Sequence, residues 1–180
     1  MASLNVPAPM RRCFRSIVGA MVAVYAGAGP AAPLEQAIKA SYVTKFAPFV
    51  EWPAAAFAGP GSPFLICLSG RDSFGPVIDD LARGQRVRGR PVQVRRVADA
   101  ASAGDCQILV IGAGTDGALV EGAGKSMLTI SDKSAGVDGG MIRFVRQGGR
   151  IRFEIDNGAA RAAHLTISSK LLELAVTVNP

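Results

Sequence analysis

Short runs of apolar residues recur along the middle of the chain, separated by glycine-containing loops and by segments with helical spacing. Residues 64–69, 107–112 and 127–131 are apolar runs of strand length, and residues 91–97 alternate between apolar and polar positions. Residues 76–82 place apolar side chains at helical intervals. Continuous apolar strands are typical of sheets buried on both faces, and their alternation with helices favours an open, mostly parallel α/β sheet flanked by helices.

Two short helical segments complete this series. Residues 99–103 predict a short helix or turn, and residues 118–121 predict part of a helix after the glycine-rich loop at 112–117. In open α/β sheets the first and third strands are commonly neighbours. We therefore expect the strand at 64–69 to lie beside the strand at 107–112.

The N-terminal part of this region begins as a helix. Residues 34–50 carry an apolar stripe at three- and four-residue intervals. Pro48, and then Trp52 followed by Pro53, end the helical pattern, because proline disfavours a helical conformation in the residue before it.

The C-terminal part alternates as antiparallel strands do. Residues 141–145 and 150–156 are alternating runs on either side of a Gly-Gly turn, which predicts a hairpin. Helical patterns return at 158–163 and 165–175. Together the segments predict one α/β domain over residues 34–178, with the antiparallel hairpin finishing one edge of the sheet.

The first 28 residues have the layout of a cleavable secretory signal. Arg11, Arg12 and Arg15 precede an uncharged stretch at 16–28, which ends in small residues that fit a signal-peptidase site. The apolar run is about 12 residues long, whereas a membrane-spanning helix needs roughly 20. The pattern therefore predicts a signal peptide over residues 1–28 and an exported domain that does not itself span a membrane. An uncleaved anchor is the alternative.

The net charge and the distribution of basic residues bear on whether the chain binds nucleic acid. Removing residues 1–28 lowers the net charge from +6 to +3, because the segment carries three arginines and no acidic residue. No basic run is interleaved with aromatic residues, so nothing favours a nucleic-acid partner.

Two cysteines remain after the signal segment, Cys67 and Cys106. An even pair in an oxidising compartment most simply forms a disulfide, with two buried, unlinked thiols as the alternative. A metal site is not expected, because the chain has one histidine and no C-x-x-C motif.

The remaining motifs point to binding more than to catalysis. His164 is the sole histidine, no nucleophile elbow is present, and no pair of carboxylates is placed for acid–base chemistry, since Asp79 and Asp80 fit a solvated helix face. Residues 112–117 match G-x-G-x-x-G, the motif of a dinucleotide-binding turn. That turn follows the first strand of its fold, whereas residues 112–117 follow the third strand, so a glycine-rich turn is the simpler interpretation and no cofactor is expected. Residues 69–75 lie where such sheets bind ligands, and Arg71 with exposed amides could hold an anion there.

Residues 46–53 combine three aromatic side chains with a carboxylate at the end of a helix. Two interpretations stay open. The aromatic residues could close one end of the core, or Trp52 could be an exposed contact for a protein partner, since tryptophan is enriched at interface hot spots.

Seven motifs, in order, resemble the YfiR family of periplasmic proteins over residues 36–176. The motifs lie at Tyr42–Pro53, Ile66–Gly75, Cys106–Ile111, Leu128–Asp132, Gly139–Phe144, Ile151–Asp156 and Leu165–Leu172. The resemblance implies a periplasmic repressor that binds the periplasmic sensor domain of an inner-membrane diguanylate cyclase, limiting cyclic-di-GMP synthesis and biofilm formation.

The resemblance also implies a Cys67–Cys106 disulfide, a homodimer and sensitivity to redox state. Some relatives carry a further cysteine pair in the C-terminal half, which this chain lacks. Candidate partner-binding residues are Trp52, Phe144 and Glu154. The alternative function is a periplasmic small-ligand-binding module that reports to a membrane sensor protein, with its pocket at 70–75. A secreted enzyme is a third, weaker alternative.

Overall fold

The computed structural model describes residues 2, 31–118 and 126–180. Ten strands occur in these ranges: β1 (Val50–Glu51), β2 (Phe64–Ser69), β3 (Arg86–Val87), β4 (Arg90–Val97), β5 (Ile108–Ile111), β6 (Leu128–Asp132), β7 (Ile142–Gln147), β8 (Arg150–Asp156), β9 (Thr166–Ile167) and β10 (Thr177–Asn179). The helices are α1 (Ala31–Phe46), α2 (Pro76–Ala82), α3 (Ala100–Ala103), α5 (Asn157–Ala162) and α6 (Ser169–Leu174), with 3-10 turns η1 (Ala47–Phe49), η2 (Ala54–Ala56) and η3 (Lys133–Ala135).

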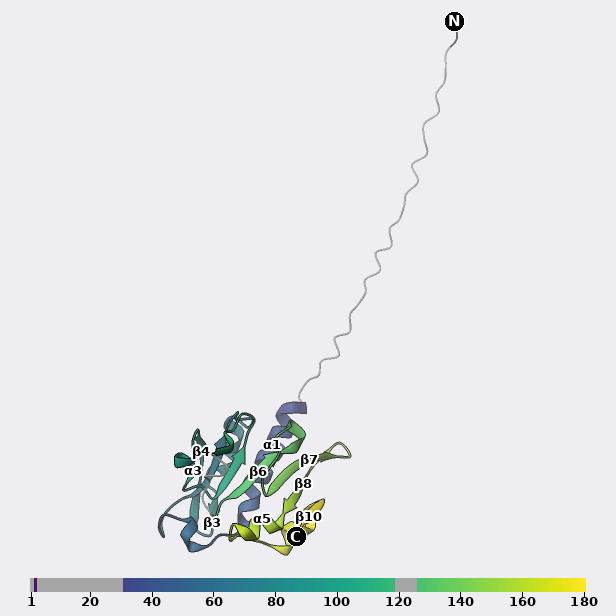
Figure 1. Ribbon diagram of the computed structural model, residues 1–180. Helices are drawn as coiled ribbons and strands as arrows, with labels where there is room; N and C mark the ends of the chain where they lie inside the picture. Colours follow the sequence, from purple (N-terminus) through teal and green to yellow (C-terminus); the bar gives the residue numbers. More distant parts are fainter. Residues whose placement is uncertain (1, 3–30, 119–125) are drawn as a thin grey trace.

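Eight strands form one sheet in the order β10-β8-β7-β6-β5-β2-β4-β3 (Figure 1). Strands β4, β2, β5, β6 and β7 are mutually parallel, and β7 and β8 form an antiparallel hairpin. The predicted fold class is therefore confirmed: an open, mostly parallel α/β sheet with the antiparallel hairpin toward one edge. The expected pairing of the strands at 64–69 and 107–112 is also present.

The parallel strands are continuous apolar runs because both faces of the sheet are covered. All six residues of β2 and all four of β5 are buried. The larger core lies on the face covered by α1 and α2, where Ile66, Ile108 and Ile130 pack. A smaller core on the opposite face gathers Leu65, Leu109 and neighbouring residues, with Ala103 of α3 among them.

Local sequence signals fix several element ends. Asp99 and Ser102 form a capping box at the start of α3, while Asp156 and Ser168 accept hydrogen bonds from the first turns of α5 and α6. The β7–β8 turn places Gly148 and Gly149 at φ +57° and +71°. Positive φ at both central residues is what a two-residue type I′ hairpin turn requires.

Two features differ from the expectations. Residues 165–168 are not helical, because Ile167 and Thr166 pair with Val50 and Glu51 in a separate two-stranded sheet. Strand β10 extends the large sheet beyond the hairpin by pairing in parallel with β8. The predicted signal peptide (1–28) and most of the predicted helix at 118–121 lie outside the described residues. Among the described residues, no helix has both the length and the apolar character needed to cross a membrane.

Candidate functional site

Trp52 follows β1 and packs half-buried against the end of the sheet where the parallel strands begin. Its Nε1–H donates to the backbone oxygen of Gln107 at 3.1 Å, and its ring meets Phe64 edge-on, with the ring centroids 4.9 Å apart. The indole therefore closes this end of the larger core. Part of the side chain still reaches the surface.

Gln107 is a structural residue that the sequence did not single out. Its side chain accepts a hydrogen bond from the backbone N–H of Leu65 at 2.7 Å and donates to the backbone oxygens of Ala56 and Asp105. The residue is 1% exposed. A buried amide with every group paired fixes the turns around it, so Gln107 holds in place the segment that carries Trp52. A lone glutamine before an apolar run gives no sequence signal for this role.

The segment around Trp52 carries aromatic and charged side chains that are exposed or half-buried, and we name four of its residues the aromatic turn: Phe49, Glu51, Trp52 and Phe57. Phe49 is 37% exposed. Glu51 is exposed and pairs with Arg88 at 3.2 Å. Phe57 packs on Phe64 next to Trp52, and the Arg90 guanidinium lies 4.0 Å from the centroid of the Phe57 ring.

Phe144 and Glu154 lie on opposite faces of the β7–β8 hairpin. Phe144 is opposite Phe153 in the strand register, whereas Glu154 is opposite Arg143. Because side chains alternate along a strand, only one of the two predicted contact residues can point toward α1. The structure therefore does not bring Trp52, Phe144 and Glu154 together as one patch.

Phe144 is a core residue. Its ring is 1% exposed and stacks on Phe46 of α1, with centroids 6.1 Å apart. In the structure α1 covers the ring, so Phe144 is not exposed to a partner, contrary to the prediction. Glu154 is accessible: its side chain is 20% exposed and lies 3.3 Å from Arg143 and 3.8 Å from Lys133.

Cys67 and Cys106 form a disulfide in the structure, with their Cα atoms 5.9 Å apart. The bond joins β2 to the residue two positions before β5, on the sheet face opposite α1. Cys67 is 0% exposed and Cys106 is 4% exposed, so the bond lies inside the smaller core.

A buried lysine connects α1 to the carboxyl-terminal edge of the sheet. Lys39 is 2% exposed, and its Nζ lies 2.5 Å from a carboxylate oxygen of Glu35 and 2.5 Å from one of Asp132. It also donates to Ser134 at 3.1 Å. Arg146 of the hairpin makes a further ion pair with Glu35. A buried ammonium needs such partners, and here they come from one helix and from the end of β6.

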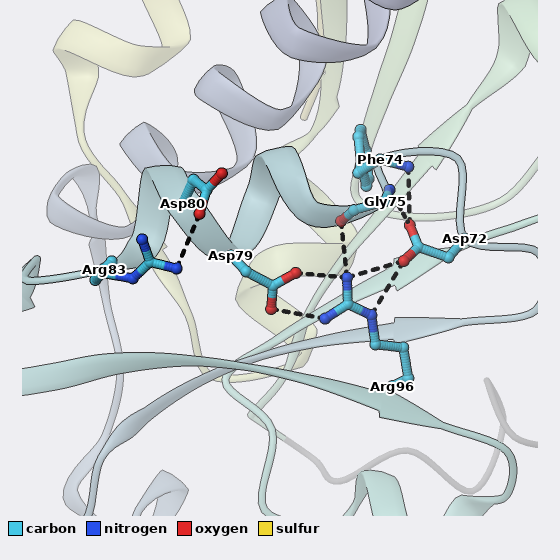
Figure 2. Close-up of polar contacts among 7 residues, drawn as sticks. All are labelled: Asp72, Phe74, Gly75, Asp79, Asp80, Arg83 and Arg96. Atoms are coloured by element: carbon cyan, nitrogen blue, oxygen red, sulfur yellow. Dashed lines mark hydrogen bonds and ion pairs between the residues drawn. The ribbon is translucent and has the colours of Figure 1, made fainter.

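Arg96 of β4 connects the loop at 70–75 with α2 (Figure 2). Its guanidinium donates to Asp72 at 2.9 Å, to both carboxylate oxygens of Asp79 at 2.7 Å, and to the backbone oxygen of Gly75 at 2.8 Å. These hydrogen bonds lower the pKa of Asp79 below its ordinary value and raise the pKa of Arg96, chiefly through the Arg96–Asp79 contact. Asp79 is thus bound to β4, while Asp80 pairs with Arg83 at 2.9 Å on the exposed side of α2.

The glycine motif at 112–117 has a packing role. A Cβ atom on Gly112 would lie 2.5 Å from the backbone oxygen of Ser69 and 2.6 Å from that of Arg71. The loops after β2 and β5 touch through their backbones, with Arg71 N–H donating to Ala113 at 2.8 Å. Close approach of two chains explains this glycine without a dinucleotide.

His164 is exposed, with φ +60° just after α5. Its backbone N–H donates to Arg161 at 2.9 Å, which is the hydrogen bond of a helix end. Within residues 31–118 and 126–180, no group of three His, Cys, Asp or Glu side chains is placed to hold a metal ion.

Comparison with models of protein families gives a match to the family described as YfiR/HmsC-like, over residues 36–176. The matched range starts in α1 and ends just before β10. No curated protein matches the chain.

Proposed function

The chain belongs to the YfiR/HmsC-like family, and we propose that it is a periplasmic repressor that binds the periplasmic domain of an inner-membrane diguanylate cyclase. Binding holds the cyclase inactive, which limits cyclic-di-GMP synthesis and thereby biofilm formation. The proposal includes removal of residues 1–28 on export, a functional domain over residues 34–178, and a homodimer.

One observation carries this proposal. The family match runs from the first helix through α6 and includes the disulfide, the hairpin and the aromatic turn. The family suggests a regulator in diguanylate cyclase signalling, a function that works by contact with another protein. Members of this family are generally not enzymes.

We place the partner contact on the aromatic turn. Phe49 is exposed, Trp52 and Phe57 are half-buried, and Glu51 forms an exposed ion pair with Arg88. An aromatic centre with a charged rim is the composition that protein interfaces favour. Trp52 therefore remains a proposed contact, held in position by Gln107.

Glu154 is a proposed contact on the sheet face opposite α1, where its carboxylate forms ion pairs with Arg143 and Lys133. Phe144 can affect a partner only through the core, by holding α1 against the hairpin.

The regulation follows from linked equilibria: a repressor that binds only the inactive cyclase shifts the cyclase toward that state, and a signal that weakens the contact releases it.

Capture from solubilised inner membrane tests the contact. The immobilised protein is expected to retain a membrane protein that has both a periplasmic sensor domain and a cyclase domain, and free protein should compete for it. Phe49→Ala should reduce the retention. Leu174→Ala is the matched control, because Leu174 is also an exposed apolar residue, at 58%. Equal loss with both variants would contradict the placement, and retention of no such cyclase would contradict the function.

A second function is favoured by a specific feature, the cavity at the carboxyl-terminal edge of the parallel strands. A small-ligand-binding module that reports to a membrane sensor would use it.

A further inference from the structure

The tip of the β7–β8 hairpin is basic and projects from the body of the domain (Figure 1). Residues 142–153 contain no acidic residue and four arginines: Arg143, Arg146, Arg150 and Arg152. Strand β10 pairs with β8 only beyond the tip, at 154–156. Arg143 is paired with Glu154, and we name the other three arginines the arginine tip.

The charge of the arginine tip is only partly balanced. Arg146 forms an ion pair with Glu35 of α1 but is still 56% exposed. Arg150 and Arg152 are exposed, and neither forms an ion pair with a carboxylate of the described residues. Because side chains alternate along a strand, Arg146 projects from the face that α1 covers, and Arg150 and Arg152 project from the other face. Basic groups therefore lie on both sides of the tip.

Exposed aliphatic side chains lie close to the arginine tip. Glu35, the partner of Arg146, follows Leu34 in α1. Leu34 is 63% exposed, and Ile38, one helical turn further along, is 39% exposed. Aliphatic and basic side chains at one end of a protein are the combination that binds the headgroup layer of an anionic bilayer. Protein interfaces are instead enriched in aromatic residues, and the aromatic turn supplies those.

The proposed export, on which this step rests, brings the same end of the domain to a membrane. The predicted signal peptide ends at residue 28, and α1 begins at Ala31. A signal peptide is inserted in the inner membrane until it is cleaved. The N-terminal end of α1 therefore enters the periplasm at the surface of that bilayer, with the arginine tip beside it.

We propose that the arginine tip and Leu34 bind the anionic phospholipid surface of the inner membrane. The guanidinium groups donate paired hydrogen bonds to lipid phosphates, as arginine does to oxyanions generally, and Leu34 enters the headgroup layer. Binding at the bilayer surface raises the local concentration of the protein around a membrane partner. The aromatic turn remains the proposed contact with that partner.

Flotation of the exported protein with lipid vesicles tests the proposal. We expect the protein to float with vesicles of phosphatidylcholine and phosphatidylglycerol in equal parts, and not with vesicles of phosphatidylcholine alone. In about 1 M NaCl, where charges are screened beyond about 3 Å, binding to the anionic vesicles should be lost.

Two pairs of variants locate the contact. Each basic residue near an anionic bilayer strengthens binding about fivefold, so Arg150→Gln/Arg152→Gln should weaken it about 25-fold. Arg86→Gln/Arg95→Gln is the matched control, because it removes the same charge from exposed positions of β3 and β4, at the other end of the strand order.

Leu34→Ala should weaken binding at least about fourfold, the effect of one buried methylene group. Leu174→Ala, at another exposed leucine, should leave binding unchanged. Thermal unfolding checks that each variant is folded, and if Arg150→Gln/Arg152→Gln is not, the comparison of the two leucine variants decides.

Absence of flotation with anionic vesicles, or equal flotation with neutral ones, would overturn the proposal. Equal loss in both arginine pairs would overturn the placement at the arginine tip. Binding to immobilised polyglutamate without flotation would assign the arginines to an acidic protein instead of a bilayer. None of these measurements contains a cyclase, so a failure here leaves the repressor function standing, and capture of no cyclase by a protein that floats contradicts the repressor function alone.

Discussion

Lys39 shows how a residue that sequence patterns treat as a surface position can hold two parts of a fold together. Its ammonium is 2% exposed and has partners from α1, from the end of β6 and from η3. The two carboxylates beside it are partly exposed, at 19% each. Removing one member of a buried ion pair is costly because the opposite charges remain without a partner.

Replacing Lys39 with methionine should therefore lower the free energy of unfolding. We expect a loss of about 2–4 kcal/mol, somewhat below the usual cost for a fully buried pair because both carboxylates retain contact with water. Chemical denaturation measures it. Arg83→Met is the control, since that ion pair is exposed at 77% and 63% and should cost less than about 0.5 kcal/mol. Equal effects of the two substitutions would contradict the structural role of Lys39.

Trp52 contributes through a hydrogen bond and through ring packing, and two substitutions separate these contributions. Trp52→Phe removes the donor to Gln107 and keeps a ring on Phe64, so it should cost about 1 kcal/mol. Trp52→Ala removes both and should cost about 2–4 kcal/mol. Thermal and denaturant unfolding measure the difference. A Trp52→Ala variant as stable as the unaltered protein would show that the indole is a surface group.

At the scale of elements, Arg96 joins β4, α2 and the loop at 70–75 (Figure 2). The contact with Arg96 lowers the pKa of Asp79. A carboxyl whose folded-state pKa is depressed stabilises the fold above its unfolded pKa, near 4, and this stabilisation is lost as the pH falls through the folded-state value.

The Asp79→Asn variant should therefore be less stable than the unaltered protein at pH 7, and the difference should shrink as the pH falls below the unfolded-state pKa, near 4, and through the lower folded-state pKa of Asp79. Urea unfolding at several pH values measures it. Asp80→Asn is the matched control on the same helix, with an expected change within about 0.5 kcal/mol at pH 7. A difference between Asp79→Asn and the unaltered protein that is independent of pH would exclude the ionised carboxylate as its source.

The elements with long, distinctive patterns were predictable. The runs at 64–69 and 76–82 match β2 and α2, because a continuous apolar strand and a helix begun by proline each leave a local signature. The strands β1, β9 and β10 have two or three residues. Segments this short have no period to detect, and only their tertiary partners make them strands.

The candidate site was less predictable for a physical reason. The register of the β7–β8 hairpin in the structure puts Phe144 and Glu154 on different faces, and the alternation in the sequence does not show which face α1 covers. The partners of Lys39 and Arg96 are up to 95 and 24 positions away in the chain, and no local pattern carries that information. The location of residues 69–75 at the carboxyl end of a central strand was predictable from the strand order.

At the scale of the whole molecule, the disulfide connects β2 to the segment just before β5 within the smaller core. Cys67 and Cys106 are 39 positions apart. A cross-link closing a loop of this length restricts the unfolded chain and stabilises the fold by about 4 kcal/mol in the loop-entropy account.

A Cys67→Ala/Cys106→Ala variant should therefore melt at a lower temperature than the oxidised protein. Dithiothreitol should lower the melting temperature of the unaltered protein and leave that of the variant unchanged. Calorimetry with and without the reductant makes the comparison. Equal melting temperatures for the variant and the oxidised protein would contradict a stabilising cross-link.

The measurement that tests the central claim most directly is the cellular cyclic-di-GMP level in a strain that lacks this gene. The account predicts that the level rises on deletion and returns to normal when the full chain is supplied. The same chain without residues 1–28, made in equal amount, should fail to restore it, because the repressor must meet the cyclase in the periplasm. A level unaffected by deletion, or restored equally well by the chain that lacks residues 1–28, would contradict the account.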